Sequence, residues 1–441
     1  MIVLACKAKE ATDSGEPSAI TVAHPEWAKD ATIYEVNVRQ YSEEGTFAAF
    51  QQHLPRLKAL GVKILWLMPI HPIGELNRKG SLGSYYSVRD YRAVNPEFGT
   101  MDDFKALVNA AHAEGMYLIL DWVANHCAWD NALLTEHPDW FTRDSLGSMI
   151  PPVPDWTDVV DFNYNNHELW DYMIESMKFW IREADVDGFR CDVAGMMPIE
   201  FWQQVRPALD AVKPVFMLAE DEQPVEHTAF DMTYGWDLMH HMNAIYAGNE
   251  NATHIADYFR QQPHLYTKHD YRMYFITNHD ENSWNGTVQE RMGDGAKAFA
   301  TLAAMAPGMP LVYSGQEAGL NKRLEFFERD PIEWVESDWA PFYSKLLNLN
   351  LTNPACWNGE DGGDFTKLET NQDDYVFAFK LEKENHQVIT VVNLSSQSRT
   401  ANITGISEGT YTELFSEQPY SSAEILSLEL TGWDYRVFVK N

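Results

Sequence analysis

The sequence predicts an α/β protein built on a (β/α)₈ TIM barrel, with a short inserted subdomain after the third strand and a C-terminal antiparallel β-sandwich. From Thr32 onward, short apolar strands alternate with longer amphipathic stretches, the pattern of such a barrel. Three of the strands lead into acidic residues, Asp192, Glu220 and Asp280. After about Pro354 the helical pattern gives way to strand-like runs separated by Gly, Asn and Ser, which indicates a sandwich.

Eight barrel strands are expected from the apolar runs. An open, doubly wound sheet is the alternative, but the Gly-rich phosphate turn that normally follows its first strand is missing from the sequence. The expected strands are Thr32–Val38, Val62–Met68, Met116–Trp122, Val186–Asp192, Val215–Glu220, Phe230–Tyr234, Arg272–Thr277 and Pro310–Ser314.

Seven helices are expected between and after these strands. Thr100 can cap the second at its start, and Gly61 and Gly115 follow the first two as C-terminal caps. The expected helices are Thr46–Leu60, Met101–Glu114, Asn166–Ala184, Ile199–Val212, Trp236–Ala247, Glu290–Met305 and Asp338–Leu349.

The chain divides into three expected parts. Residues 1–30 form a signal remnant and tether, residues 31–353 the catalytic barrel, and residues 354–441 the sandwich. Within the barrel, residues 127–165 interrupt the strand-helix pattern and are rich in Pro, Asp and Trp. They are therefore expected to form the inserted subdomain.

The N-terminus resembles the end of a bacterial lipoprotein signal, in which Cys6 would be acylated. The polar stretch from Lys7 to Asp30 would then be a tether, and the protein would be exported to the periplasm or cell surface. The basic segment and full apolar stretch of a signal are missing, so a chance apolar start is the alternative. No other segment approaches the roughly 20 apolar residues of a membrane span.

Composition limits the classes of partner. The 441 residues carry 33 Lys and Arg against 65 Asp and Glu, a formal net charge of −32. Such a surface repels nucleic acid and anionic membranes, whereas a neutral carbohydrate is compatible with it. The four cysteines are far apart in the sequence, which predicts neither a disulfide framework nor a cysteine metal site.

The run from Asp187 to Val193 is the most informative segment. Side chains alternate along a strand, so Arg190 and Asp192 face one side and Cys191 faces the other. A carboxylate beside a guanidinium stays ionised, as a nucleophile requires. Three apolar strands, each leading into an acid, therefore indicate a carboxylate-based active site at one rim of the barrel.

Four short segments, in this order, resemble the signatures of glycoside hydrolase family 13, the α-amylase family. The resemblance covers nearly the whole chain from about Ala31. The segments are Asp121-Trp-Val-Ala-Asn-His126, Asp187-Gly-Phe-Arg-Cys-Asp192, Leu218-Ala-Glu220 and Phe275-Ile-Thr-Asn-His-Asp280.

The resemblance implies a role for each site residue. Asp192 would be the nucleophile, Glu220 the general acid/base, and Asp280 a third acid that grips sugar hydroxyls. Arg190 would orient Asp192, and Asp121 would be structural. The substrate-binding residues would be His126, His279 and Tyr86, with the neighbouring Tyr85 as the alternative for the ring that stacks on the sugar.

Calcium is the one cofactor that the resemblance raises, and no organic cofactor is implied. Asn125 and Asp161 match side-chain ligands of calcium-binding relatives, but the ion usually takes six to eight oxygens and only these two can be named. Where many α-amylases have a His four residues after the nucleophile, this chain has Met196.

Specificity remains open at this level. Gly195 and Met196 stand where many endo-acting α-amylases have Lys-His on the leaving-group side. The expected reaction is retaining hydrolysis of α-1,4-glucosidic bonds in starch-type glucans or maltooligosaccharides. The alternatives are an α-1,6-glucosidase, a cyclodextrinase, a glucosyl transferase, and a non-catalytic glycan-binding ancillary protein.

Overall fold

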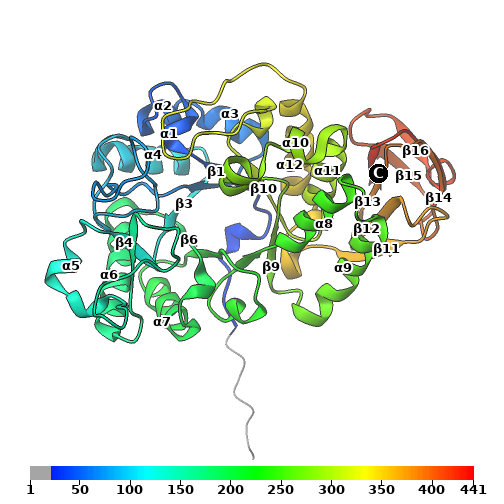
Figure 1. Ribbon diagram of the computed structural model, residues 1–441. Coiled ribbons are helices and arrows are strands. Elements are labelled where there is room, and N and C mark those ends of the chain that lie inside the picture. Colours follow the sequence, from blue (N-terminus) through cyan, green and yellow to red (C-terminus); the bar gives the residue numbers. More distant parts are fainter. Residues whose placement is uncertain (1–20) are drawn as a thin grey trace, which may run out of the picture.

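The computed structural model describes residues 21–441, so Cys6 and most of the predicted tether lie outside the described residues. Eight parallel strands close into a barrel in the order β1-β10-β9-β8-β7-β6-β3-β2 (Figure 1). The predicted TIM barrel is confirmed. Its strands are β1 Ile33–Val36, β2 Ile64–Leu67, β3 Tyr117–Trp122, β6 Gly188–Cys191, β7 Phe216–Ala219, β8 Met232–Tyr234, β9 Tyr271–Tyr274 and β10 Met309–Tyr313.

Helices surround the barrel (Figure 1). One link differs from regular alternation: β7 and β8 are joined by a 3₁₀ turn, Pro224–Thr228, and not by an α-helix. The α-helices before the C-terminal domain are α1 Val38–Tyr41, α2 Phe47–Gln51, α3 Leu54–Leu60, α4 Met101–Ala113, α5 Leu133–Glu136, α6 His167–Ala184, α7 Ile199–Asp210, α8 Trp236–Tyr246, α9 Ala252–Leu265, α10 Val288–Met292, α11 Ala296–Met305 and α12 Trp339–Thr352.

Two predicted helices are broken in the structure. The helix expected over Thr46–Leu60 becomes α2 and α3, because Pro55 lacks the amide that a continuous helix would use and instead occupies the first turn of α3. The helix expected over Glu290–Met305 becomes α10 and α11 at Gly293. A Cβ there would lie 1.8 Å from the Tyr246 hydroxyl, so the chain turns where only glycine fits.

The inserted segment leaves and rejoins the barrel at one place. Its first strand, β4 His126–Ala128, pairs antiparallel with β5 Val159–Asp161. Between them the chain carries α5 and irregular turns. The hairpin therefore fixes the insert above the C-terminal ends of β3 and β6.

The C-terminal domain is a β-sandwich, as predicted. A six-stranded antiparallel sheet, β11-β12-β13-β18-β15-β16, shares a hydrophobic core with the two-stranded sheet β14-β17. The elements are β11 Asp364–Leu368, β12 Val376–Lys383, β13 His386–Asn393, β14 Arg399–Asn402, β15 Thr410–Glu413, β16 Pro419–Ser421, α13 Ser422–Ile425, β17 Ser427–Leu430 and β18 Tyr435–Lys440.

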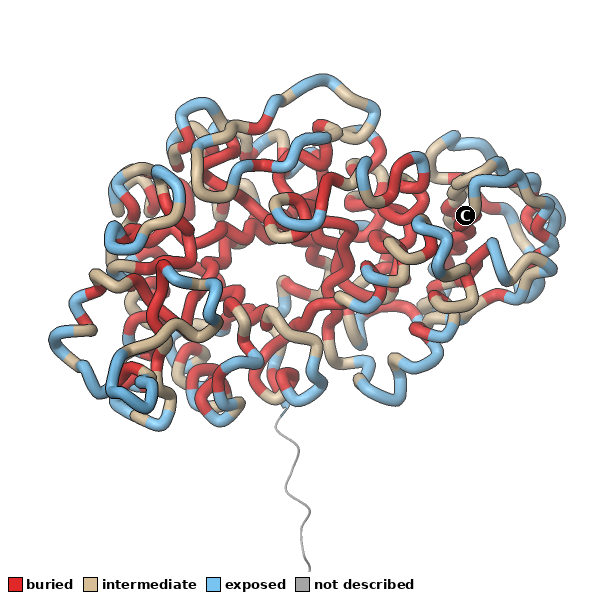
Figure 2. Tube along the Cα trace, viewed as in Figure 1, coloured by how far each residue is buried: buried red, intermediate tan, exposed pale blue. Residues whose placement is uncertain are grey.

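The barrel and the sandwich also share a core. Figure 2 shows buried segments running from the barrel strands into the C-terminal sheet. Phe342 of α12 stacks on Phe415 with ring centroids 5.4 Å apart, and Phe259 of α9 stacks on Phe377 of β12 at 5.7 Å. The C-terminal domain therefore packs directly against the barrel helices α9 and α12.

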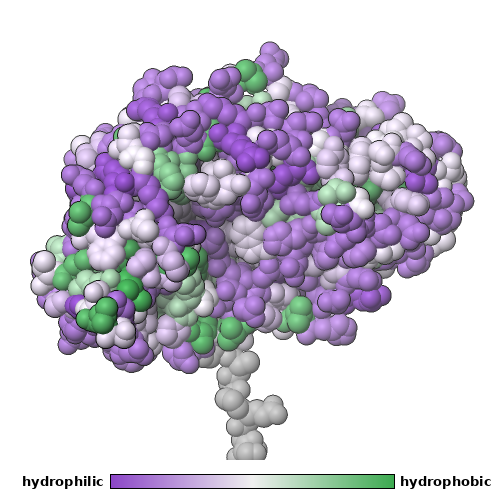
Figure 3. Space-filling view, viewed as in Figure 1, coloured by the Kyte–Doolittle hydropathy of each residue, from purple (hydrophilic) through white to green (hydrophobic). Residues whose placement is uncertain are grey.

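The residues just before β1 pack on the barrel. Trp27 stacks on Tyr117 with centroids 3.9 Å apart, and His24 Nδ1 lies 2.7 Å from Asp231 Oδ1. The described end of the predicted tether is thus part of the barrel wall. Among residues 21–441, no helix has the length and apolar character to cross a membrane. The face drawn in Figure 3 is mostly hydrophilic.

Candidate active site

The register of β6 and β7 places two carboxyl groups side by side. Cys191 pairs with Ala219, so Asp192 and Glu220 are the next residues on neighbouring strands. Gly188 permits this close pairing, since a Cβ there would lie 1.9 Å from the Phe216 carbonyl oxygen. Both acids follow the C-terminal ends of their strands, where barrel active sites are built.

Arg190 holds both carboxylates with one guanidinium. Its Nη1 lies 3.0 Å from Asp192 Oδ1, and its Nη2 lies 2.8 Å from Glu220 Oε1. Nη1 also lies 2.8 Å from Asp121 Oδ1, and Arg190 is fully buried. Cys191 is fully buried as well, which fits the predicted alternation of this strand.

The backbone after Asp192 is strained and points an amide at the second acid. Val193 has φ 40° and ψ 46°, in the left-handed region that a β-branched residue rarely adopts. Its N–H donates to Glu220 Oε2 at 2.7 Å. The strained backbone of Val193 therefore places the amide that holds the Glu220 carboxyl group, and such strain is typical of active sites.

The two acids compete for one positive charge. Burial raises the pKa of Asp192, and the nearby charge of Glu220 raises it further, against the opposing effect of Arg190. Burial also raises the pKa of Glu220, again against Arg190. The neighbouring Arg190 predicts an ionised Asp192, and the structure corrects this prediction because burial and the charge of Glu220 act against the guanidinium. Because Arg190 contacts three carboxylates, the charges of Asp192 and Glu220 influence each other and the two acids titrate as a coupled pair.

His279 lies between two acids on the other side of the site. Its Nδ1 lies 2.5 Å from Glu35 Oε1 and its Nε2 lies 3.4 Å from Asp280 Oδ2. Burial lowers the pKa of His279, but the carboxylates of Asp280 and Glu35 outweigh that effect and raise it to about 9. His279 is therefore a cation at neutral pH.

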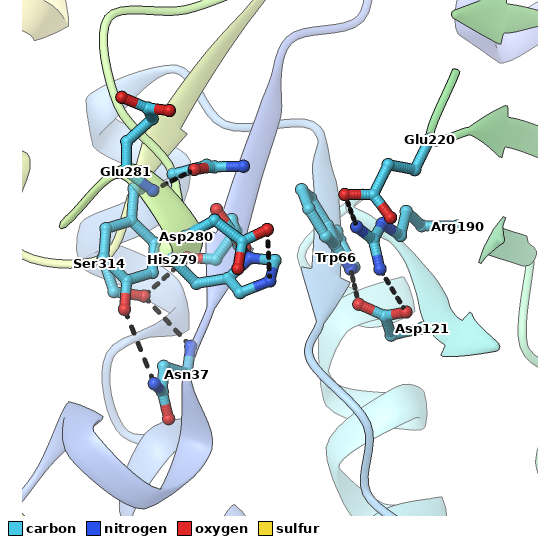
Figure 4. Close-up of polar contacts among 12 residues, drawn as sticks. Asn37, Trp66, Asp121, Arg190, Glu220, His279, Asp280, Glu281 and Ser314 are labelled. Carbon is cyan, nitrogen blue, oxygen red and sulfur yellow. Dashed lines mark hydrogen bonds and ion pairs between the residues drawn. The ribbon is translucent and has the colours of Figure 1, made fainter. Parts of the chain in front are cut away.

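Asp121 anchors the floor of the site, as the sequence analysis expected. Its Oδ2 accepts from Trp66 Nε1 and from the Tyr86 hydroxyl, each at 3.1 Å, while its Oδ1 faces Arg190. Figure 4 shows Asp121 and Glu220 on opposite sides of the Arg190 guanidinium, with His279 and Asp280 across from them.

A cleft with a cavity of about 610 Å³ opens above these residues. That volume lies within the roughly 300–1,000 Å³ of small-molecule sites. Asp192, Glu220 and Asp280 all line the cleft. The aromatic residues of its wall are Tyr86, Trp156, Trp284, Phe326 and Phe327.

The predicted sugar-binding residues lie around this cleft, although not all at strand ends. Tyr86, His126 and His279 line the cleft. His126 begins β4 and His279 follows β9 by several residues, so both lie beyond the barrel strands themselves. Burial lowers the pKa of His126 to about 3, so its ring is neutral. Tyr85 is 1% exposed and lies outside the lining, which favours Tyr86 as the stacking ring.

The segment after Asp192 leaves no room for a side chain at position 195. A Cβ on Gly195 would lie 1.8 Å from Asp221 Oδ2, so this carboxylate occupies the space that a side chain at position 195 would need. Met196 is 48% exposed. The space beside position 195 is therefore occupied by the Asp221 carboxylate from the neighbouring strand end, and position 196 presents an exposed thioether.

The two candidate calcium ligands lie beside each other in the β4–β5 hairpin. Asp161 pairs with His126, and the Phe162 amide donates to the Asn125 carbonyl at 3.1 Å. Burial raises the pKa of the Asp161 carboxyl. Within residues 21–441 there is no cluster of three or more His, Cys, Asp or Glu able to hold a metal ion. Further calcium ligands would therefore have to be amide or carbonyl oxygens and water.

Several residues at the site were not singled out from the sequence. Glu35 stands alone among apolar residues in β1, a signal that was available in the sequence. Trp284 lies in a π-helical turn, Glu281–Asn285, directly after Asp280. Such turns are often found at functional sites, but their sequence pattern does not distinguish them from ordinary helix.

Comparison with known proteins agrees with this geometry. The family model described as "Alpha amylase, catalytic domain" matches residues 21–145 and 154–377. The α-amylase MalA of Haloarcula japonica is 27% identical over 407 residues, covering 88% of this chain and 58% of that relative.

Two solved structures match over most of both chains. The maltogenic α-amylase AmyB of Thermotoga neapolitana has a TM-score of 0.86 at 32% identity and covers 93% of this chain and 98% of its own. An α-amylase of Lactobacillus plantarum has a TM-score of 0.85 at 32% identity, covering 93% and 99%. Chemically, the site offers two carboxyl groups bridged by one guanidinium beneath a cleft lined by aromatic rings.

Proposed function

Because the chain belongs to the α-amylase family of glycoside hydrolases, we propose that it hydrolyses α-1,4-glucosidic bonds in starch-type glucans or maltooligosaccharides with retention of configuration. The observation that carries the proposal is the pair of Asp192 and Glu220, bridged by the single guanidinium of Arg190. Two carboxyl groups at the ends of adjacent strands suit the separation of about 5–5.5 Å used in retaining hydrolysis.

In the first step Asp192 Oδ attacks the anomeric carbon while Glu220 gives its proton to the leaving oxygen. The glycosidic C–O bond breaks, and a covalent β-glucosyl ester forms on Asp192. This step needs Glu220 in its protonated form, which its raised pKa favours. Before the attack, the negative charge of the Asp192 carboxylate is stabilised by Arg190 Nη1, which lies 3.0 Å from Asp192 Oδ1.

In the second step Glu220 takes a proton from water, and the water oxygen attacks the anomeric carbon. The ester bond to Asp192 breaks and the α-configured sugar leaves. The cationic His279 and the carboxylate of Asp280 line the same cleft, where they can hydrogen-bond the hydroxyls of the reacting ring. The ring of Tyr86 supplies an apolar face for stacking.

The test uses maltooligosaccharides and the variants Asp192→Asn and Glu220→Gln. We expect wild-type protein to release α-anomers first, as read by proton NMR, and Asp192→Asn to abolish turnover. Glu220→Gln should lose about 10²–10⁴-fold in kcat on oligosaccharides, the usual contribution of a general acid. The rate at which Glu220→Gln forms the Asp192 ester from an activated aryl glucoside should fall much less, because that leaving group needs no proton.

Initial release of β-anomers would contradict retention. Activity of Asp192→Asn equal to wild type would contradict the assigned nucleophile. Transfer products that form without a net gain of reducing ends would favour a glucosyl transferase.

Calcium stays a prediction and has its own test. If Asn125 and Asp161 help to hold the ion, added Ca²⁺ should stabilise the protein by about 2.7 kcal/mol at about 100 times its Kd. Thermal unfolding with Ca²⁺ or a chelator reads this, and Asn125→Ala should remove the difference. A Tm insensitive to both would mean that calcium is not bound.

A further inference from the structure

Three loops meet at Lys79, at the edge of the cleft. The Lys79 Nζ lies 3.0 Å from Asp158 Oδ1 and donates to the Asp155 carbonyl at 2.8 Å, both in the insert after β3. It also lies 5.9 Å from the ring centroid of Phe327, in the loop after β10. Lys79 itself belongs to the loop after β2, and all four residues line the cleft. We call Lys79, Asp155, Asp158 and Phe327 the clasp.

Backbone contacts hold the clasp closed. The Leu82 amide donates to the Phe327 carbonyl at 3.1 Å, and the Ser81 amide donates to Glu328 Oε1 at 2.7 Å. Gly80 packs so tightly that a Cβ there would lie 2.5 Å from Phe327 Cβ. The loops after β2 and β10 are therefore joined along several residues and not by one side chain.

The loops of the clasp that carry Lys79 and Phe327 lie across the barrel mouth from Glu220, whereas Asp155 and Asp158 belong to the insert above β3 and β6. Glu220 follows β7, and β1 is four places from β7 round the ring of eight strands. Two of the three clasp loops follow β2 and β10, which are the neighbours of β1. Since Glu220 protonates the leaving oxygen, the leaving glucan extends on the Glu220 side. The sugar that is retained on Asp192 extends toward the clasp.

We propose that the clasp closes the retained-sugar end of the cleft, so that the protein cuts a short fragment of one predominant length from the non-reducing end of its glucan. This inference rests on the proposed function and adds the direction of attack. On this proposal a glucan does not run on past the point where Lys79 bridges the loops, and the internal bonds of a long glucan do not reach the site.

The wall beside the clasp suits a terminal sugar. Trp284 is 52% exposed and contacts Phe326 and Phe327, with centroids 5.2 and 5.8 Å away. An exposed indole next to Asp280 gives an apolar surface for stacking, while Lys79 and Asp158 offer polar groups to the last hydroxyls. The closed end is thus equipped to bind a chain terminus.

The experiment follows the products of a maltooligosaccharide labelled at its reducing end. The leaving part carries the label, so the length of the unlabelled product reports the retained side. Wild-type protein should give one short unlabelled product from the earliest time. The double variant Lys79→Ala/Asp158→Ala removes both charges together, which avoids leaving Asp158 buried and unpaired.

We expect the double variant to give unlabelled products at least one sugar longer. It should also show a several-fold rise in the ratio of activity on amylose to activity on maltotriose. Lys105→Ala/Glu183→Ala is the matched control, because it removes an ion pair of the same 3.0 Å length between the outer helices α4 and α6. Its products should equal those of wild type.

A wild-type spread of unlabelled lengths at early times would overturn the inference, as would a clasp variant that cuts with an unchanged pattern. Either result would leave the proposed hydrolysis intact. No cleavage of any α-1,4-glucan by wild type or variant would overturn the proposed function and this inference together.

Discussion

At the scale of single residues, Val193 links backbone strain to the acid. The left-handed conformation costs a residue with a side chain roughly 1–2 kcal/mol, and the observed conformation points the Val193 N–H at Glu220. Val193→Gly would relieve the strain, and the added freedom of the unfolded chain would offset part of that gain. We expect little change in Tm but a fall in kcat of about tenfold, because a looser backbone holds Glu220 less well.

The control for this substitution is Glu384→Gly. Glu384 has φ 54° in the exposed hairpin between β12 and β13, far from the cleft in the fold. It should leave kcat unchanged. Equal kcat for Val193→Gly and wild type would show that the Val193 amide does not position the acid.

His279 makes stability depend on pH. Its folded pKa of about 9 lies above the ordinary 6.5, so its ion pairs with Glu35 and Asp280 stabilise the protein fully below pH 6.5. This contribution is lost as pH rises through about 9. The Tm difference between wild type and His279→Gln should therefore shrink between these values. A difference that is independent of pH would contradict a cationic His279.

At the scale of elements, the contact of β6 with β7 sets the distance between nucleophile and acid. A Cβ at Gly188 would lie 1.9 Å from the Phe216 carbonyl oxygen, and backbone cannot yield as a flexible side chain can. We expect Gly188→Ala to destabilise the protein by more than about 4 kcal/mol, or to prevent folding. Chemical denaturation measures the change.

Gly115→Ala provides the comparison. Gly115 also has positive φ, but a Cβ there would meet no atom within 4 Å. Its cost should be only that of the left-handed conformation, about 1 kcal/mol. Similar losses for the two variants would mean that the close approach of the strands is unimportant.

The sequence predicts those elements whose causes are local. The apolar runs and the glycine caps predict the barrel strands, and alternation along β6 predicts that Arg190 and Asp192 meet. The breaks at Gln52–His53 and at Gly293 depend on local prolines and glycines within strongly helical patterns. They were missed because the hydrophobic period continues across them.

Contacts between distant loops could not be predicted in this way. Arg190 contacts three carboxylates because of the register of β3, β6 and β7. That register cannot be read from any one segment of the sequence. The same holds for Lys79, whose partners lie in two other loops. The raised pKa of Asp192 follows from burial and from the nearby charge of Glu220, whereas its sequence neighbours alone indicate an ionised group.

At the scale of the whole molecule, the common core predicts that the barrel and the sandwich unfold together. Phe342 and Phe259 belong to barrel helices but pack on rings of the C-terminal domain. We expect a single calorimetric transition. Phe342→Ala should lower the free energy of unfolding by about 3–5 kcal/mol and move the whole transition to a lower temperature. Two separate transitions, with only one of them shifted, would contradict a shared core.

The arrangement around Arg190 also bears on inhibition. A neutral sugar that enters the cleft leaves in place the proton that the proposed mechanism requires on Glu220 of the Asp192–Glu220 pair. A sugar mimic with a positively charged ring nitrogen would instead favour the fully ionised pair and expel that proton into solvent. Affinity for such a cation will therefore rise with pH until the pair is fully ionised or the inhibitor itself loses its charge, and the buffer will record one proton released per molecule bound. The resting site thus holds a proton on one of its two acids, and a cationic inhibitor must displace that proton in order to bind.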